Sequence, residues 1–400
     1  MITKRHVFHV SGYDPVSPDS LHRRFTRESA IFSRTWNVDA RVGPIERRDG
    51  QPCWTVRTRG QNWSVTSVYE PLDWHDIVLG DIDRPLPLLL RDGFAAGFDF
   101  VRSGTAKRYF AASPGYAIFF FSAYLLVLVL AAAAIGIGAV ALYVFGAPLP
   151  LAVVVALLSF PLLMHVLGRR WRVQHGLADW TFSRAYAHGQ RPDMTKRVEQ
   201  FAARIAARAQ AGGVDEIVCI GHSVGAILLI EAIAQLLDRN PDIGRGGAKL
   251  TVLTVGSTMP KLSLHPAAAE LRAASARVAA QSAIDWTEYQ TRGDMISFYK
   301  FHPVALQPLS AATEEIRPQI CRIRMREMLS ARTRRRRRLS WMRMHYQLVM
   351  ANELCAKYDY FMFVCGPVSA AELAGWPGGP LHFLTVRGEY RHAPALFAVS

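Results

Sequence analysis

The pentapeptide Gly221-His222-Ser223-Val224-Gly225 places a serine between two glycines, the G-x-S-x-G pattern of an activated serine nucleophile. A strand-like run, "EIVCI", precedes it, and a helix-like run, "VGAILLIEAIAQLLDRN", follows it. Glycine suits the flanking positions because a sharp strand-to-helix turn leaves no room for a Cβ. The pattern alone arises by chance in roughly one protein in ten of this length, so its surroundings decide its meaning.

A serine hydroxyl attacks a carbonyl only when a base accepts its proton, so a histidine and an acid are expected elsewhere in the chain. Asp294 follows the predicted strand "WTEYQ", and Asp285, which precedes that strand, is the competing acid. His345 follows the predicted strand "QICRIRMREML", and His302, which precedes it, is the competing base. Asp294 could instead cap a turn, and His345 could be a surface histidine of a helix.

In these features the chain resembles the lipase and esterase-like branch of the α/β-hydrolase fold family, whose order along the chain is nucleophile, acid, histidine. The resemblance rests on Gly221-His222-Ser223-Val224-Gly225, with a histidine before the serine as in many lipases. It implies a catalytic triad of Ser223, Asp294 and His345. In this triad His345 is the general base and Asp294 fixes the tautomer of its ring. No metal or organic cofactor is implied.

The oxyanion of the reaction would receive one N–H from Val224, at the start of the helix after the serine. The resemblance implies a second donor in a glycine-containing loop after an earlier strand. The segment "FHVSGYDP" is the counterpart here, with Gly12 or Tyr13 as the donor. It differs from the family pattern because "SGY" replaces "HGG", and because more than 200 residues separate this loop from Ser223.

Strands that alternate with helices around these residues predict an α/β-hydrolase-like fold, with a mostly parallel sheet flanked by helices. Residues 1–108 are expected to supply the first part of the hydrolase domain, and residues 169–400 its main part with the nucleophile, acid and base. The first part is predicted to contain a strand ending at Ser11, a helix over 19–33, a β-hairpin from "PCWTVRTRG" and "NWSVTSVYE", and a strand in "HDIVLGDID". The main part adds an amphipathic helix in "PDMTKRVEQFAARIAARAQAGG", a strand in "KLTVLTVGS" and a helix in "HPAAAELRAASARVAAQ".

The segment between these parts, 109–168, contains no Asp, Glu, Lys or Arg. It predicts a hairpin of two transmembrane helices, about 117–145 and 149–167, separated by "GAPLP". Basic residues flank both ends, so the positive-inside rule places both ends in the cytoplasm. The predicted location is therefore a bacterial inner membrane, with the catalytic domain facing the cytoplasm. Two buried core helices of a soluble protein are the alternative.

The formal net charge of +15 is densest at an arginine run in "ARTRRRRRLSWMRM", formed by Arg334, Arg335, Arg336, Arg337 and Arg338. We expect this run to be a polybasic loop that contacts anionic membrane lipid, with a merely solvated loop or a nucleic-acid contact as alternatives. The sequence has no nucleic-acid-binding motif and no interleaved aromatic residues, which argues against nucleic acid. The five cysteines are scattered without zinc-like spacing, which indicates free thiols and no metal site of that kind.

The expected function is that of a membrane-anchored serine hydrolase, which cleaves carboxylic ester bonds through an acyl-enzyme on Ser223. The membrane location alone suggests lipids or other apolar acyl compounds as substrates. A thioesterase or acyltransferase with the same triad is one alternative. A catalytically silent, hydrolase-like membrane scaffold is the other. The sequence specifies neither the acyl group nor an oligomeric state.

Overall fold

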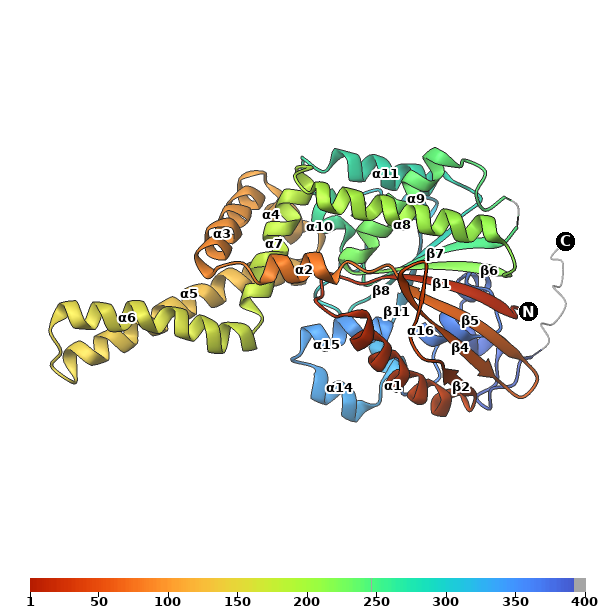
Figure 1. Cartoon of the computed structure of the whole chain (residues 1–400), viewed down its shortest axis with the longest axis horizontal. Coiled ribbons are helices and arrows are strands. Elements are labelled where there is room, and N and C mark those ends of the chain that lie inside the picture. Colours follow the sequence, from red (N-terminus) through yellow and green to blue (C-terminus); the bar gives the residue numbers. More distant parts are fainter. Residues whose placement is uncertain (246, 392–400) are drawn as a thin grey trace. The chain divides into compact units, whose positions relative to one another are not determined.

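The computed structural model describes residues 1–245 and 247–391, which divide into two compact units. Unit 1 comprises 1–75, 193–263 and the described residues from 269 on, and unit 2 comprises 76–192 and 264–268. Unit 1 has an α/β fold with a mostly parallel sheet, as the sequence predicts, and unit 2 is helical (Figure 1). Unit 2 includes the predicted insertion 109–168 and extends beyond it on both sides.

The main sheet of unit 1 has the strand order β2-β4-β5-β1-β6-β7-β8-β11. Its strands in this order are Asp39–Val42, Gln51–Arg59, Ser64–Pro71, Lys4–Val10, Glu216–His222, Lys249–Val255, Asp285–Thr291 and Gln319–Ile323. β4 is antiparallel to both of its neighbours in this order, whereas every pair from β5 to β11 is parallel. The short strand β3 (Glu46–Arg48) also pairs with β4, and β9 (Phe301–His302) pairs with β10 (Gln307–Pro308) in a separate sheet.

The direction of the chain reverses at the centre of this sheet. From β1 the chain continues through β2, β4 and β5 on one side, and from β6 it continues through β7, β8 and β11 on the other. β1 and β6 are parallel neighbours, and Val10 at the end of β1 lies opposite Gly221. Ligands of open α/β sheets bind outside the carboxyl ends of the strands at such a reversal. The ends of β1 and β6 are therefore the place where a site is expected.

Helices cover both faces of the sheet (Figure 1): α8 (Pro192–Ala211), α9 (Val224–Arg239) and α11 (Ala269–Ala280) on one, α1 (Pro18–Trp36) and α16 (Tyr360–Cys365) on the other. The α1 face is aromatic, because Phe25 packs 4.8 Å from the Tyr69 ring and 4.9 Å from the Phe361 ring. Shorter helices complete unit 1: α10 (Met259–Ser263), α12 (Ala311–Glu314), α13 (Met325–Met328), α14 (Ala331–Arg337), α15 (Trp341–Tyr346), a 3₁₀ turn (Gln347–Val349), α17 (Ala370–Gly375) and α18 (Pro380–Phe383).

Unit 2 contains the two apolar helices that the sequence predicts. Its elements are most of α2 (His75–Ile82), then α3 (Leu86–Arg102), α4 (Thr105–Ala112), α5 (Pro114–Tyr143), α6 (Leu149–Leu163), a π-helical continuation of α6 (Met164–Gly168) and α7 (Val173–Ala187). α5, and α6 with its continuation, are long and apolar enough to cross a membrane, with 30 and 20 residues. They pack closely at Gly138, where a Cβ would lie 2.7 Å from the carbonyl oxygen of Ala152. Small residues at such a contact are typical of helices that associate in lipid.

Three segments differ from the prediction. "HDIVLGDID" forms helix α2 and not a strand, because a short apolar run does not distinguish the two and Asp76 favours a helical first turn. The predicted strand "QICRIRMREML" ends at Ile323, and α13 follows it. The arginine run, predicted to be a loop, forms α14 with Arg338 directly after it. Arginine is a good helix former, and Ser330 caps this helix by accepting a hydrogen bond from the Thr333 N–H.

Candidate functional site

Ser223 stands at a sharp turn between β6 and α9, at the carboxyl end of β6. Its backbone has φ 56° and ψ −125°, a conformation that costs a non-glycine residue about 1–3 kcal/mol and is found mainly at functional sites. The flanking glycines are sterically required. A Cβ on Gly225 would lie 2.2 Å from the carbonyl oxygen of Val10, and one on Gly221 would lie 2.6 Å from the Cα of Ala226.

The loop after β1 passes directly over Ser223. A Cβ on Gly12 would lie 2.9 Å from the Cβ and 3.3 Å from the Oγ of Ser223, so only a glycine allows this approach. α9 begins at Val224, so the Val224 N–H has no carbonyl partner four residues earlier within the helix. The next residue of the loop, Tyr13, is buried with its ring edge-on to Trp74 at 5.8 Å. The structure thus brings Gly12, Ser223 and Val224 together at one end of the sheet.

Asp294 and His345, 51 residues apart in the chain, form a buried hydrogen-bonded pair. Asp294 lies three residues after β8, and His345 lies in α15. The Nδ1–H of His345 donates to the Asp294 carboxylate at 2.7 Å, and the other carboxylate oxygen accepts from the Ile296 N–H at 2.9 Å. Within the described residues, Nε2 of His345 is buried without a hydrogen-bond partner. It makes no hydrogen bond with the Ser223 hydroxyl in this structure.

Gly256, which was not predicted from the sequence, lies between the Asp294–His345 pair and the serine turn. It follows β7 directly with φ +53°, and a Cβ there would lie 3.2 Å from both the Asp294 carboxylate and Cε1 of His345. The residue before it, Val255, accepts a hydrogen bond from the Ser223 N–H at 3.3 Å. The glycine of "TVGS", at the end of a predicted buried strand, could have indicated this position, because glycine allows a left-handed backbone and close packing.

His222 packs between the serine turn and α15. Its ring lies 4.5 Å from that of His345, and its Nε2 lies 3.4 Å from the His345 carbonyl oxygen. Burial holds the pKa of His222 well below the ordinary histidine value, so this ring is neutral. Tyr346 also packs on it at 5.5 Å and donates its phenolic hydrogen bond to Asp14.

The competing acid and base lie outside this cluster. Asp285 is the first residue of β8, at the amino end of the strands, and pairs with Lys249 at 3.0 Å. Both ring nitrogens of His302 are used by the backbone. Its Nε2–H donates to the carbonyl of Ile316, and its Nδ1 accepts from the N–H groups of Val304 and Ala305. His302 therefore has a structural role.

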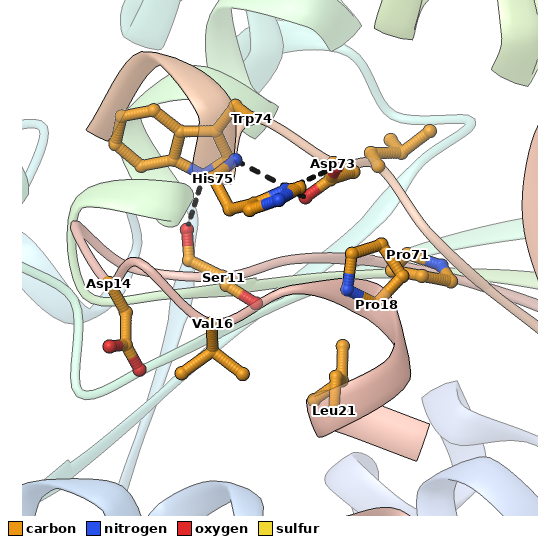
Figure 2. A pocket seen from close by; sticks show the side chains of 10 residues that line it. Ser11, Asp14, Val16, Pro18, Leu21, Pro71, Asp73, Trp74 and His75 are labelled. Carbon is orange, nitrogen blue, oxygen red and sulfur yellow. Dashed lines mark hydrogen bonds and ion pairs between the residues drawn. The ribbon is translucent and has the colours of Figure 1, made fainter. Parts of the chain in front are cut away.

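A small recess adjoins the Gly12 loop, between the segments that follow β1 and β5 (Figure 2). Its volume is about 10 Å³, the room of one water molecule. The Trp74 indole N–H donates to the carbonyl of Ser11 at 3.0 Å, and His75 pairs with Asp73 at 2.7 Å (Figure 2). The Trp74 hydrogen bond links the Gly12 loop to the segment after β5, and the His75–Asp73 pair lies within that segment.

Unit 2 holds a separate cluster that sequence spacing could not reveal, formed by Asp99, His188 and His265. His188 and His265 approach the Asp99 carboxylate at 2.9 and 3.3 Å, and Arg184 approaches it at 3.5 Å. Nδ1 of His265 accepts from the Ala267 N–H, so its Nε2 carries the proton that faces Asp99. A metal would need that nitrogen deprotonated and would lie close to the Arg184 cation, so the arrangement fits an ion-pair cluster.

Comparison with known proteins finds no match: no protein-family model, no curated protein and no solved structure is significantly similar to this chain.

Proposed function

We propose that the protein is a serine hydrolase of the α/β-hydrolase type, with Ser223 as nucleophile, His345 as general base and Asp294 as the acid that orients it. The observation that carries the proposal is the buried Asp294–His345 hydrogen bond of 2.7 Å. It leaves Nε2 of His345 without a hydrogen-bond partner among the described residues, at the end of the sheet that holds Ser223. Catalytic hydrogen bonds are often long in free enzymes and shorten when substrate binds. An unpaired Nε2 at the same end of the sheet as a strained serine therefore suits a general base.

The reaction follows from these roles. Nε2 of His345 takes the hydroxyl proton while Oγ of Ser223 bonds to the substrate carbonyl carbon, and Asp294 stabilises the resulting imidazolium. The N–H of Val224 and that of Gly12 or Tyr13 stabilise the negative oxygen. The imidazolium then gives its proton to the leaving alcohol, which leaves an acyl-enzyme on Ser223. Water, activated by the same histidine, releases the carboxylic acid.

We further propose that α5 and α6 anchor the protein in a membrane, with both ends of the hairpin on the cytoplasmic side. Two helices of membrane length, both rich in exposed apolar residues, support this anchor. The exposed arginines of α14 suit contact with anionic lipid headgroups. Carboxylic esters with apolar acyl groups, as in lipids, are the substrate class that such a location favours.

Labelling with a fluorophosphonate tests the nucleophile, because this reagent phosphonylates an activated serine. Wild type should be labelled, and Ser223→Ala should lose the label. Ser282→Ala is the matched control, because Ser282 is exposed in the turn before β8, at the amino end of the strands. Circular dichroism verifies that each variant folds. Equal labelling of wild type and Ser223→Ala, or no labelling of folded wild type, contradicts the proposal.

A further inference from the structure

Helix α3 of unit 2 has two apolar faces, and only one of them is buried. The buried face is formed by Leu89, Gly93, Ala96 and Phe100. The other face consists of Phe94, Phe98 and Val101, which are 41%, 66% and 52% exposed. Their spacing of four and three residues aligns them along the helix, and we call them the Phe98 stripe. Three such residues on one helix face indicate a surface that meets an apolar partner.

Basic side chains border this stripe. Arg102 follows Phe98 by four residues and Arg91 precedes it by seven, so both lie along one edge, and both are exposed. α3 also carries two carboxylates: Asp92 pairs with Arg84 and with Arg91 itself, and Asp99 pairs with Arg184 and the two histidines of its cluster. An apolar face bordered by arginines is typical of helices that lie in the plane of a membrane.

The other edge of the stripe packs against α5. The Phe94 ring lies 5.7 Å from the Tyr124 ring, and a Cβ on Gly97 would lie 2.8 Å from Cζ of the same tyrosine. In α4, Phe110 is 50% exposed and stacks on Phe121 of α5 at 5.9 Å. Exposed apolar side chains of α3 and α4 therefore pack directly against the membrane-length helix.

The position of this junction along α5 matches the thickness of a bilayer. At about 1.5 Å per residue, Tyr124 lies roughly 29 Å from the end of α5 at Tyr143, and a hydrocarbon core is about 30 Å thick. Nearer the start of α5, Phe120 packs against Trp180 of α7 at 4.7 Å, so this turn belongs to the protein interior. If the hairpin tip reaches the far side, Tyr124 lies at the near interface.

We propose that the Phe98 stripe and Phe110 lie in the membrane interface, with the apolar rings at the level of the first acyl carbons and Arg91 and Arg102 on the phosphate groups of anionic phospholipids. The partner is the bilayer itself. The proposal rests on the membrane anchor proposed above, and it makes α3 and α4 an in-plane platform beside the spanning hairpin.

Single-site fluorescence in phospholipid vesicles tests this position. Cys321 and Cys355 are half-buried and would be replaced by serine, while the other three cysteines are buried. An environment-sensitive fluorophore is then attached to the full chain at Phe98→Cys, at Ile135→Cys on α5, or at Asp83→Cys, an exposed position just before α3. The vesicles contain phosphatidylcholine and phosphatidylglycerol, with nitroxide quenchers near the headgroup or deep in the acyl chain.

The label at 98 should emit at shorter wavelength than the label at 83, resist aqueous iodide several-fold better, and be quenched more by the shallow nitroxide than by the deep one. The label at 135 should respond most to the deep nitroxide, because this position lies roughly 16 Å beyond Tyr124, near the middle of the hydrocarbon core. Equal iodide quenching at 98 and 83, with 135 still protected, would overturn the interface proposal alone. Full exposure of all three labels would instead reject the membrane anchor.

Discussion

At the scale of single residues, Asp294 decides which nitrogen of His345 can act as a base. The carboxylate accepts the Nδ1–H, so the lone pair is left on Nε2, and it would also stabilise the cation that forms during reaction. An amide at this position could donate a hydrogen bond to Nδ1, which would move the ring proton to Nε2 and remove the base.

We therefore expect Asp294→Asn to fold and to lower kcat for a nitrophenyl ester by about 10⁴-fold, the order seen when a triad acid becomes an amide. Asp285→Asn is the matched control. That carboxylate is partly exposed and pairs with Lys249 at the amino end of the strands. Steady-state kinetics of both variants measure the difference. If the two substitutions had the same effect on kcat, the role given to Asp294 would be wrong.

At the scale of elements, the serine turn depends on the close approach of α9 to the end of β1. The carbonyl oxygens of Val10 and Ser11 occupy the space that a Cβ on Gly225 would need. Because both contacts are backbone atoms, the strand end or the helix must move to accept a larger residue.

Gly225→Ala should therefore lower the free energy of unfolding by about 1–3 kcal/mol, the usual effect of overpacking. It should also lower activity, because the shift moves Ser223. Gly375→Ala in α17 is the control, since a Cβ there meets no atom within 4 Å. Urea unfolding in detergent, followed by tryptophan fluorescence, compares the two. If Gly225→Ala and Gly375→Ala had the same free energy of unfolding, the close contact between α9 and the end of β1 would be contradicted.

Elements with a long periodic pattern were predicted correctly from the sequence. The strand–turn–helix around Ser223, the amphipathic helix α8 and the two apolar helices are examples. Short segments were not. α2 and α14 were predicted to be a strand and a loop, because eight or fewer residues fix neither a hydrophobic period nor a cap.

At the scale of the whole molecule, buried ionisable groups make the stability of the fold depend on pH. Burial raises the pKa of Glu288 from 4.5 to about 7, although Gln290 and Thr254 donate hydrogen bonds to it. Between these pH values the folded protein holds a proton that the unfolded chain has lost. Stability therefore falls as the pH rises through this window, by up to about 3 kcal/mol, and is constant above it.

His9 acts in the opposite sense. Burial lowers its pKa from 6.5 to about 3. Between these pH values His9 is protonated in the unfolded chain and neutral in the folded protein. Its contribution to stability is therefore lost as the pH falls below 6.5. The pH profile of the wild type combines both effects, so the contribution of Glu288 has to be isolated by substitution.

Glu288→Gln should be more stable than wild type at pH 8, and this difference should shrink at pH 5, where wild-type Glu288 is protonated. Glu199→Gln on the exposed side of α8 is the control and should show no such trend. Urea unfolding of both variants at the two pH values measures the differences. A Glu288→Gln protein less stable than wild type by the same amount at both would contradict the raised pKa.

The sequence by itself determined the serine turn between its glycines, the strand and the helix on either side of that turn, and the uncharged hairpin. Each of these depends on residues close together in the chain, through backbone preference and hydrophobic period. The sequence also pointed to Asp294 and His345, but only through a resemblance in chain order.

Only the tertiary structure decided that β1 lies between β5 and β6, which brings Gly12 over Ser223 from more than 200 residues away. It also decided that Asp294 and His345 pair beside Gly256. The physical reason is that parallel strands have no local turn to set their partners. Their order follows from the burial of all their side chains together, which no single segment encodes.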